Sequence, residues 1–204
     1  SVFNVPPLFD DSYYGGVIHE IRDMQIMNMG NYAHGNQPIQ HMIYLYNYSG
    51  EPWKSQYWTR EVMRKLYTPT PDGYCGDEDN GQTSAWYVFS ALGMYTVAPG
   101  TDQYILGSPL FKKATISLEN GKQVVITSEG NGSNNRYVDA MSVNGMDYTK
   151  NYLTHKQLMD GADIRFRMSD KPNKTRGTKE ADLPYSFSTE LKQNNPKLWN
   201  KIRK

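Results

Sequence analysis

The sequence predicts an α+β fold with helices in the first half and mainly antiparallel strands in the second. Up to about residue 98 the apolar residues recur at helical spacing, whereas beyond it short alternating runs are separated by Asn-Gly turns. The 204 residues are 38% hydrophobic, which is enough for a substantial core. We therefore expect helices and loops over 1–100, a small β-domain over 101–170 and a polar, basic tail over 171–204.

The helical spacing predicts four helices, over the ranges Gly16–Gln25, Pro38–Gly50, Thr59–Leu66 and Thr83–Tyr95. Pro38 favours a helix start, because proline is tolerated at a first helical position. In the third range Trp58, Val62 and Leu66 recur on one face. Pro99 lies beyond the end of the fourth helix.

At least five strands are expected in the second half, over the ranges Ala114–Leu118, Val124–Thr127, Tyr137–Val143, Tyr148–Leu153 and Ile164–Met168. Asn120-Gly121 predicts a two-residue turn between the first two strands, and Asn144-Gly145 predicts a second hairpin. A short helical piece should end at Gly161. These elements indicate a small antiparallel sheet or sandwich packed on the helices.

The charge balance excludes several classes of partner. Twenty-two Lys and Arg against 21 Asp and Glu give a net charge of +1, so no global field exists to hold nucleic acid or an anionic membrane. No apolar stretch approaches 18 residues, and a single cysteine excludes an intrachain disulfide framework. From Asp170 onward nine basic residues face four acidic ones, and we expect partial disorder there.

Three consecutive acids, Asp77, Glu78 and Asp79, lie within the acidic loop (Asp72–Gln82). An EF-hand calcium loop does not fit, because Gly81 and Val88 stand where ligands are required. A solvated turn that caps the following helix would fit. So would a catalytic base, with Asp77 and Asp79 on one side of an extended segment and Glu78 on the other.

The second cluster is the polar segment (His34–His41). His34, Asn36, Gln37, Gln40 and His41 supply neutral donors and acceptors that suit a hydroxyl-rich ligand or the oxygen shell of a hard cation. The alternative is helix capping with one buried, hydrogen-bonded histidine. Two histidines without a third ligand do not indicate zinc.

Aromatic residues make up 13% of the chain and suit the binding of sugar rings. Trp53 follows Gly50 and Pro52, so we expect it in a loop at a ligand face. Cys75 is not expected to be a nucleophile, because the neighbouring acids raise the pKa of its thiol.

The ranges that carry these features, His34–Lys54 and Pro71–Tyr87, followed by Gly107-Ser108-Pro109, resemble glycoside hydrolase family 92, a family of bacterial exo-acting α-mannosidases. The resemblance extends from about Gly15 to Met168. It implies an N-terminal β-sandwich and a catalytic (α/α)6 barrel. Because 204 residues are too few for both, the chain resembles the last barrel helices, the base loop and the closing β-region.

The resemblance also implies calcium-dependent hydrolysis of terminal α-mannosides, often α-1,2-linked, with inversion. Asp77 and Asp79 match the general base positions of the family. The family's general acid is a glutamate expected upstream of Ser1, so we expect very low activity from this chain by itself. An extracytoplasmic location is implied as well. The partners implied are a mannose-containing glycan and the remainder of the parent enzyme.

From the same resemblance we assign the remaining site residues. Asn36 and Gln37 are the expected Ca²⁺ ligands, and the expected substrate-binding residues are His34, Asn36, His41, Trp53 and Glu78. Gln37 stands where many members have glutamate, so its amide carbonyl would ligate calcium with less charge. Two alternatives remain: a non-catalytic carbohydrate-binding or assembly module, and a hydrolase of mannosyl-phosphate linkages, whose leaving group needs little protonation.

Overall fold

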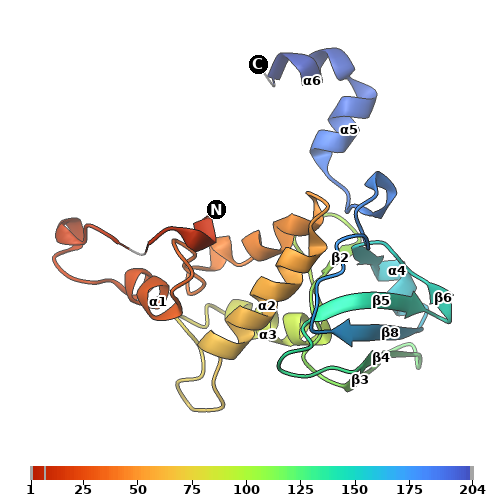
Figure 1. The fold of residues 1–204 in the computed structure, drawn as a ribbon, viewed down its shortest axis with the longest axis horizontal. Helices are drawn as coiled ribbons and strands as arrows, with labels where there is room; N and C mark the ends of the chain where they lie inside the picture. Colours follow the sequence, from red (N-terminus) through yellow and green to blue (C-terminus); the bar gives the residue numbers. More distant parts are fainter. Residues whose placement is uncertain (1, 7, 203–204) are drawn as a thin grey trace.

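The α+β class is confirmed by a computed structural model that describes residues 2–6 and 8–202. Helix α1 lies at one side of the molecule and the five-stranded sheet at the other, with α2 and α3 between them (Figure 1). Among the described residues, no helix has both the length and the apolar character needed to cross a bilayer.

Within this part of the chain the α-helices are α1 (His19–Met27), α2 (Pro52–Leu66), α3 (Gln82–Leu92), α4 (His155–Met159), α5 (Phe187–Asn194) and α6 (Pro196–Ile202). The 3-10 helices are η1 (Val2–Asn4), η2 (Ser12–Tyr14), η3 (Gln37–Ile39), η4 (Met42–Asn47) and η5 (Glu180–Asp182). Helix α2 begins earlier than predicted because Pro52 starts it. Helix α3 ends at Leu92, since Gly93 takes a left-handed φ of 93°.

The prediction of one α-helix over Pro38–Gly50 is wrong, because η3 and η4 occupy that range. The side chain of Asn47 favours 3-10 geometry near the end of η4. Its buried side-chain amide donates to the Tyr44 carbonyl at 3.0 Å and to the Leu106 carbonyl at 3.0 Å. The Tyr44 carbonyl therefore has a side-chain partner in place of the backbone N–H that an α-helix would supply.

Two sheets form the β-domain. The smaller contains β1 (Met94–Tyr95), β2 (Gln103–Leu106) and β7 (Tyr152–Thr154) in antiparallel order β1-β2-β7. The larger has the order β3-β4-β8-β5-β6, with β3 (Lys113–Ser117), β4 (Gln123–Glu129), β5 (Tyr137–Val143), β6 (Met146–Asp147) and β8 (Ala162–Ser169). The pair β4 and β8 is parallel, so the larger sheet is mixed rather than wholly antiparallel.

The turns explain how the hairpins differ from expectation. Gly121, at φ 80°, closes a three-residue turn between Leu118 and Lys122 rather than the predicted two-residue turn. Asn144 and Gly145 have φ of 52° and 79° and form the predicted two-residue turn between β5 and β6. The predicted strand over Tyr148–Leu153 is replaced by β6 and β7, which lie in different sheets.

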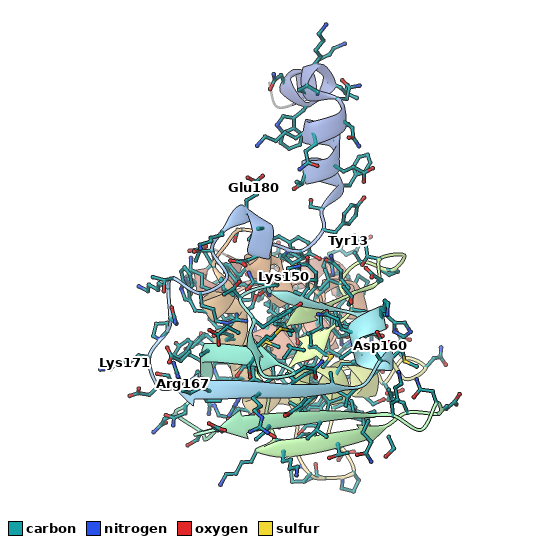
Figure 2. All side chains as sticks on the ribbon, turned by 90° about the vertical axis from the view of Figure 1, so that its right-hand side faces the viewer. Tyr13, Lys150, Asp160, Arg167, Lys171 and Glu180 are labelled. Atoms are coloured by element: carbon teal, nitrogen blue, oxygen red, sulfur yellow. The ribbon has the colours of Figure 1, made fainter. Side chains whose placement is uncertain are left out.

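The tail is more ordered than predicted. Arg176 is only 8% exposed, and its guanidinium donates to the carbonyls of Tyr148 and Lys150. Asn151 donates to the Gly177 carbonyl at 2.7 Å. These polar contacts fix a segment whose low hydrophobicity predicted disorder. Beyond it, α5 and α6 project from the body in two views turned by 90° (Figures 1 and 2).

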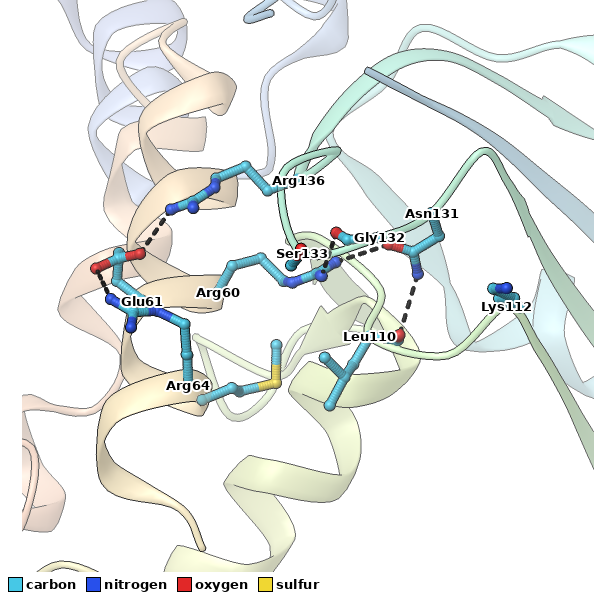
Figure 3. A pocket seen from close by; sticks show the side chains of 10 residues that line it. Arg60, Glu61, Arg64, Leu110, Lys112, Asn131, Gly132, Ser133 and Arg136 are labelled. Atoms are coloured by element: carbon cyan, nitrogen blue, oxygen red, sulfur yellow. Dashed lines mark hydrogen bonds and ion pairs between the residues drawn. The ribbon is translucent and has the colours of Figure 1, made fainter. Parts of the chain in front are cut away.

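A buried arginine joins the helices to the β-domain. Arg60, on α2, donates to the Pro109 carbonyl at 2.7 Å, to Asn131 Oδ1 at 2.9 Å and to the Gly132 carbonyl at 2.9 Å (Figure 3). Nearby, Glu61 pairs with Arg136 at 2.6 Å and with Arg64 at 3.0 Å. The charged groups around this cavity of about 380 Å³ are thus largely satisfied within the chain, which indicates a structural junction.

Replacing this arginine should destabilise the fold. Arg60→Met removes three hydrogen bonds from a charged donor and leaves the buried Asn131 Oδ1 without a donor among the described residues, which should lower the free energy of unfolding by about 3 kcal/mol. The matched control is Arg64→Met on the same helix, whose side chain is 61% exposed and should cost less than about 1 kcal/mol. Urea unfolding of both variants measures the difference, and equal losses would contradict the assignment.

Candidate functional site

The structure brings the polar segment and the acidic loop together at a pair of glycines. A Cβ atom on Gly35 would lie 3.1 Å from the Cα atom of Gly76. A Cβ atom on Gly76 would lie 2.6 Å from the Gly35 carbonyl oxygen, and Gly76 has a φ of 65°. The two backbones therefore approach more closely than any side chain would allow.

Gln37 connects the two segments through its side chain. Its Nε2 donates to the Asp77 carbonyl at 2.8 Å, and Thr83 Oγ1 donates to the same carbonyl at 2.8 Å. A carbonyl only accepts, so the amide nitrogen of Gln37 must face it and a glutamate could not replace it there. Gln37 Oε1 is the atom that remains for the predicted cation.

Glu78 faces the start of α3. Its Oε2 accepts from the Gly81 N–H at 2.5 Å and its Oε1 accepts from the Ser84 N–H at 3.0 Å. The hydrogen bonds from Ser84 and Gly81 lower the pKa of the Glu78 carboxyl. This agrees with the helix-capping alternative for the acidic loop, because each carboxylate oxygen has one backbone donor at the start of α3. The contact of Glu78 with sugar stays a prediction.

Asp77 and Asp79, the predicted base pair, are both exposed. Neither carboxylate has a hydrogen bond or an ion pair with the described residues. The backbone between them is not extended as predicted, because Asp79 and Asn80 have left-handed φ of 56° and 58° and Gly81 follows at 93°. A left-handed φ costs a non-glycine residue roughly 1 kcal/mol, and such strain is often found at functional sites.

His34 is a core residue. It is fully buried, with Nδ1 2.8 Å from the Tyr32 hydroxyl and Nε2 2.8 Å from the Tyr67 hydroxyl. Its ring packs edge-on against Trp86 of α3, 4.3 Å between centroids. Burial lowers the pKa of His34 to about 3. This is the buried, hydrogen-bonded histidine of the alternative interpretation, and no atom of it is open to the predicted sugar.

The other predicted residues are dispersed. Asn36 is exposed beside Gln37, and His41 is half-buried before η4. Trp53 lies in the first turn of α2, not in a loop, because Pro52 starts that helix. At about 1.5 Å per residue, Trp53 is roughly 20 Å from the end of α2 that leads to the acidic loop. It borders a separate aromatic groove with Tyr46 and Tyr57.

Asp23 of α1 is a residue that sequence reasoning missed. Its Oδ2 lies directly over Gly35, buried and without a hydrogen-bond partner among the described residues. Burial raises the pKa of the Asp23 carboxyl, and burial together with Asp23 raises the pKa of Cys75 to about 12. The thiol therefore stays protonated, as expected. A lone aspartate on an amphipathic helix gives no signal in the sequence.

The donors present fit calcium only in part. Within the described residues, no group of three or more His, Cys, Asp or Glu side chains could hold a metal ion. Asn36 and Gln37 offer amide oxygens, which are suitable ligands for a hard cation. Calcium takes six to eight oxygens, so a calcium site here would need ligands in addition to these two amides.

Comparison with known proteins identifies a family. Residues 7–170 match the family model described as "Glycosyl hydrolase family 92 catalytic domain". The structure resembles the family GH92 inverting mannosidase BT2199 of Bacteroides thetaiotaomicron, with 54% identity, a TM-score of 0.78 and coverage of 92% of this chain and 26% of that one. It also resembles the family GH92 α-mannosidase BT3965 of that organism, at 43% identity and a TM-score of 0.77, covering 79% and 21% of the two chains.

A curated relative is an uncharacterised secreted glycosidase of Arthroderma benhamiae, 26% identical over 162 residues, which are 78% of this chain and 21% of that protein. The chain thus spans between a fifth and about a quarter of the length of these relatives. The family model matches well over half of the chain. The chain therefore belongs to glycosyl hydrolase family 92.

Proposed function

We propose that this chain supplies the base side of the active site of an inverting exo-α-mannosidase. The observation that carries the proposal is the pair of exposed, unpaired carboxylates of Asp77 and Asp79, held on a loop that Gln37 and Thr83 fix at the Asp77 carbonyl. The similarity to an inverting family GH92 mannosidase supports the same activity.

In inversion a carboxylate base and a carboxylic acid act from opposite sides of the sugar, far enough apart to admit a water. One of Asp77 and Asp79 accepts the proton of the water as its oxygen attacks the anomeric carbon. The other accepts the second hydrogen bond of that water and orients it. The proton for the departing oxygen comes from a glutamate in the preceding part of the enzyme, and the favoured substrate is a terminal α-1,2-linked mannose.

Calcium belongs to the same proposal. Asn36 and Gln37 would hold it through their amide oxygens, beside the acidic loop. When bound, the ion would polarise the 2- and 3-hydroxyl groups of mannose and favour a distorted ring. The residues of this chain position the ligands for it and the base opposite the sugar. As in the secreted relative, we place the enzyme outside the cytoplasm.

A carbohydrate-binding module is the second candidate, and the aromatic groove beside Trp53 favours it. Tyr46, Trp53, Tyr57 and Tyr137 line this groove of about 270 Å³, and stacked aromatic faces suit sugar rings. Binding of this kind would not need calcium. It would leave the geometry of the acidic loop without a role, so hydrolysis is the better-supported function.

Neutralising the base pair should abolish turnover. In an enzyme that includes the preceding barrel, Asp77→Asn or Asp79→Asn should lower kcat on an aryl α-mannoside by roughly 100- to 10,000-fold, because a general base is lost. Mannose binding, measured by calorimetry, should persist. Asp72→Asn, in the same exposed loop, is the matched control and should keep full activity. Unchanged rates in both base variants would refute the proposal.

Restoring the usual family residue at Gln37 should be harmful here. Gln37→Glu removes the donor to the Asp77 carbonyl and places negative charge against it, which should cost about 1–3 kcal/mol locally. We expect kcat to fall at least about tenfold and limited proteolysis of the acidic loop to accelerate. Gln193→Glu on α5 is the control. Full activity with tighter calcium binding would show instead that cation ligation dominates at this position.

Removal of calcium separates the two candidate functions. Chelation should lower kcat/KM of the enzyme and readdition should restore it, since the amide ligands act only through the ion. Titration calorimetry with a mannose oligosaccharide provides the second readout. Sugar binding and hydrolysis that both persist after chelation would exclude the calcium assignment.

A further inference from the structure

The acidic loop contains a turn in which two consecutive residues other than glycine are left-handed. Asp79 and Asn80 both adopt a left-handed φ, of 56° and 58°, before Gly81. Residues other than glycine adopt this conformation at some cost in free energy, which is smallest for asparagine and aspartate, so two of them in succession benefit from an added restraint. The Gln82 N–H bonds to the Asp79 carbonyl at 3.3 Å, which is a long hydrogen bond and does not suffice.

Glu78 supplies the restraint. Its side chain spans the turn, because Oε2 accepts from Gly81 N–H at 2.5 Å and Oε1 accepts from Ser84 N–H at 3.0 Å. Its backbone carbonyl accepts from the Thr83 N–H at 3.1 Å. One residue therefore ties both ends of the strained turn to the N-terminus of α3, where a negative charge is favoured.

The turn sets the direction of Asp79 relative to Asp77. In an extended segment the two side chains would leave on the same side, since residues two apart share a face. With Asp77 fixed at its carbonyl by Gln37 and Thr83, relaxation of Asp79 to an ordinary φ would move its carboxylate but not that of Asp77.

We propose that Glu78 is a positioning residue, which holds Asp79 in its left-handed conformation so that both aspartates face one water. The proposal rests on the base role proposed above for Asp77 and Asp79. Glu78 acts through the backbone of the loop and does not touch the substrate.

The test compares variants of Glu78 with and without a glycine at position 80, because glycine relieves the cost of the left-handed φ there. In an enzyme that includes the preceding barrel, Glu78→Ala should lower kcat on an aryl α-mannoside by about 100-fold, the effect of a misplacement of about 1 Å, with KM within about twofold. Glu78→Gln, which keeps one acceptor oxygen, should have a kcat between those of Glu78→Ala and the unchanged enzyme. Asn80→Gly alone should be nearly as active as the unchanged enzyme, because glycine adopts the turn freely.

The double variant Glu78→Ala with Asn80→Gly is decisive. If Glu78 acts by holding the turn, glycine at this position should restore kcat at least about tenfold over Glu78→Ala. If Glu78 binds sugar, KM should rise and the double variant should stay as slow as Glu78→Ala, which overturns the proposal. Failure of the base role is a separate result, seen as undiminished rates in Asp77→Asn and Asp79→Asn.

Discussion

The backbone contact between Gly35 and Gly76 is the constraint on which the site depends. It places two segments that are some forty residues apart in sequence at van der Waals distance. Only after this approach can the Gln37 side chain reach the Asp77 carbonyl and Thr83. A larger residue at either glycine would separate the carboxylates of the acidic loop from the amides of the polar segment.

Around this contact the polar groups divide into two kinds. His34 and Gln40 are buried and hydrogen-bonded, His34 to tyrosine hydroxyls and Gln40 to His34 and Gln82. They attach the polar segment to α3. The side chains of Asn36, Asp77 and Asp79 are exposed and accessible to a ligand or a water molecule. Buried, uncharged residues thus support the exposed carboxylates. A site whose geometry must be maintained needs such support.

Local chemistry in the sequence explains the elements that could be predicted. Apolar spacing located α1, α2 and α3, and Asn144-Gly145 specified its turn because both residues accept a left-handed φ. Family resemblance singled out Asp77 and Asp79, whose role remains a prediction. Neither source could decide that His34 is buried, because its burial depends on contacts with Tyr67 and Trp86, which are distant in the sequence.

Two further differences have separate causes. The sequence predicts a loop at Trp53 because Gly50 and Pro52 precede it, yet the same proline starts α2. The ordered part of the tail depends on Arg176, which reaches carbonyls beside β7 rather than packing as an apolar residue would. A segment of low hydrophobicity that is held by buried polar contacts has the same composition as a disordered segment, so composition does not distinguish the two.

The position of β8 has a consequence for biosynthesis. It is the last strand in the part of the chain that the structure describes, yet it occupies the centre of the larger sheet, between β4 and β5. Until Ala162–Ser169 leaves the ribosome, the two hairpins on either side share no neighbour and each presents an unpaired edge. The larger sheet can therefore be completed only after β8 has been synthesised. Until then the unpaired strand edges are prone to aggregation, and chaperone binding would have its largest effect.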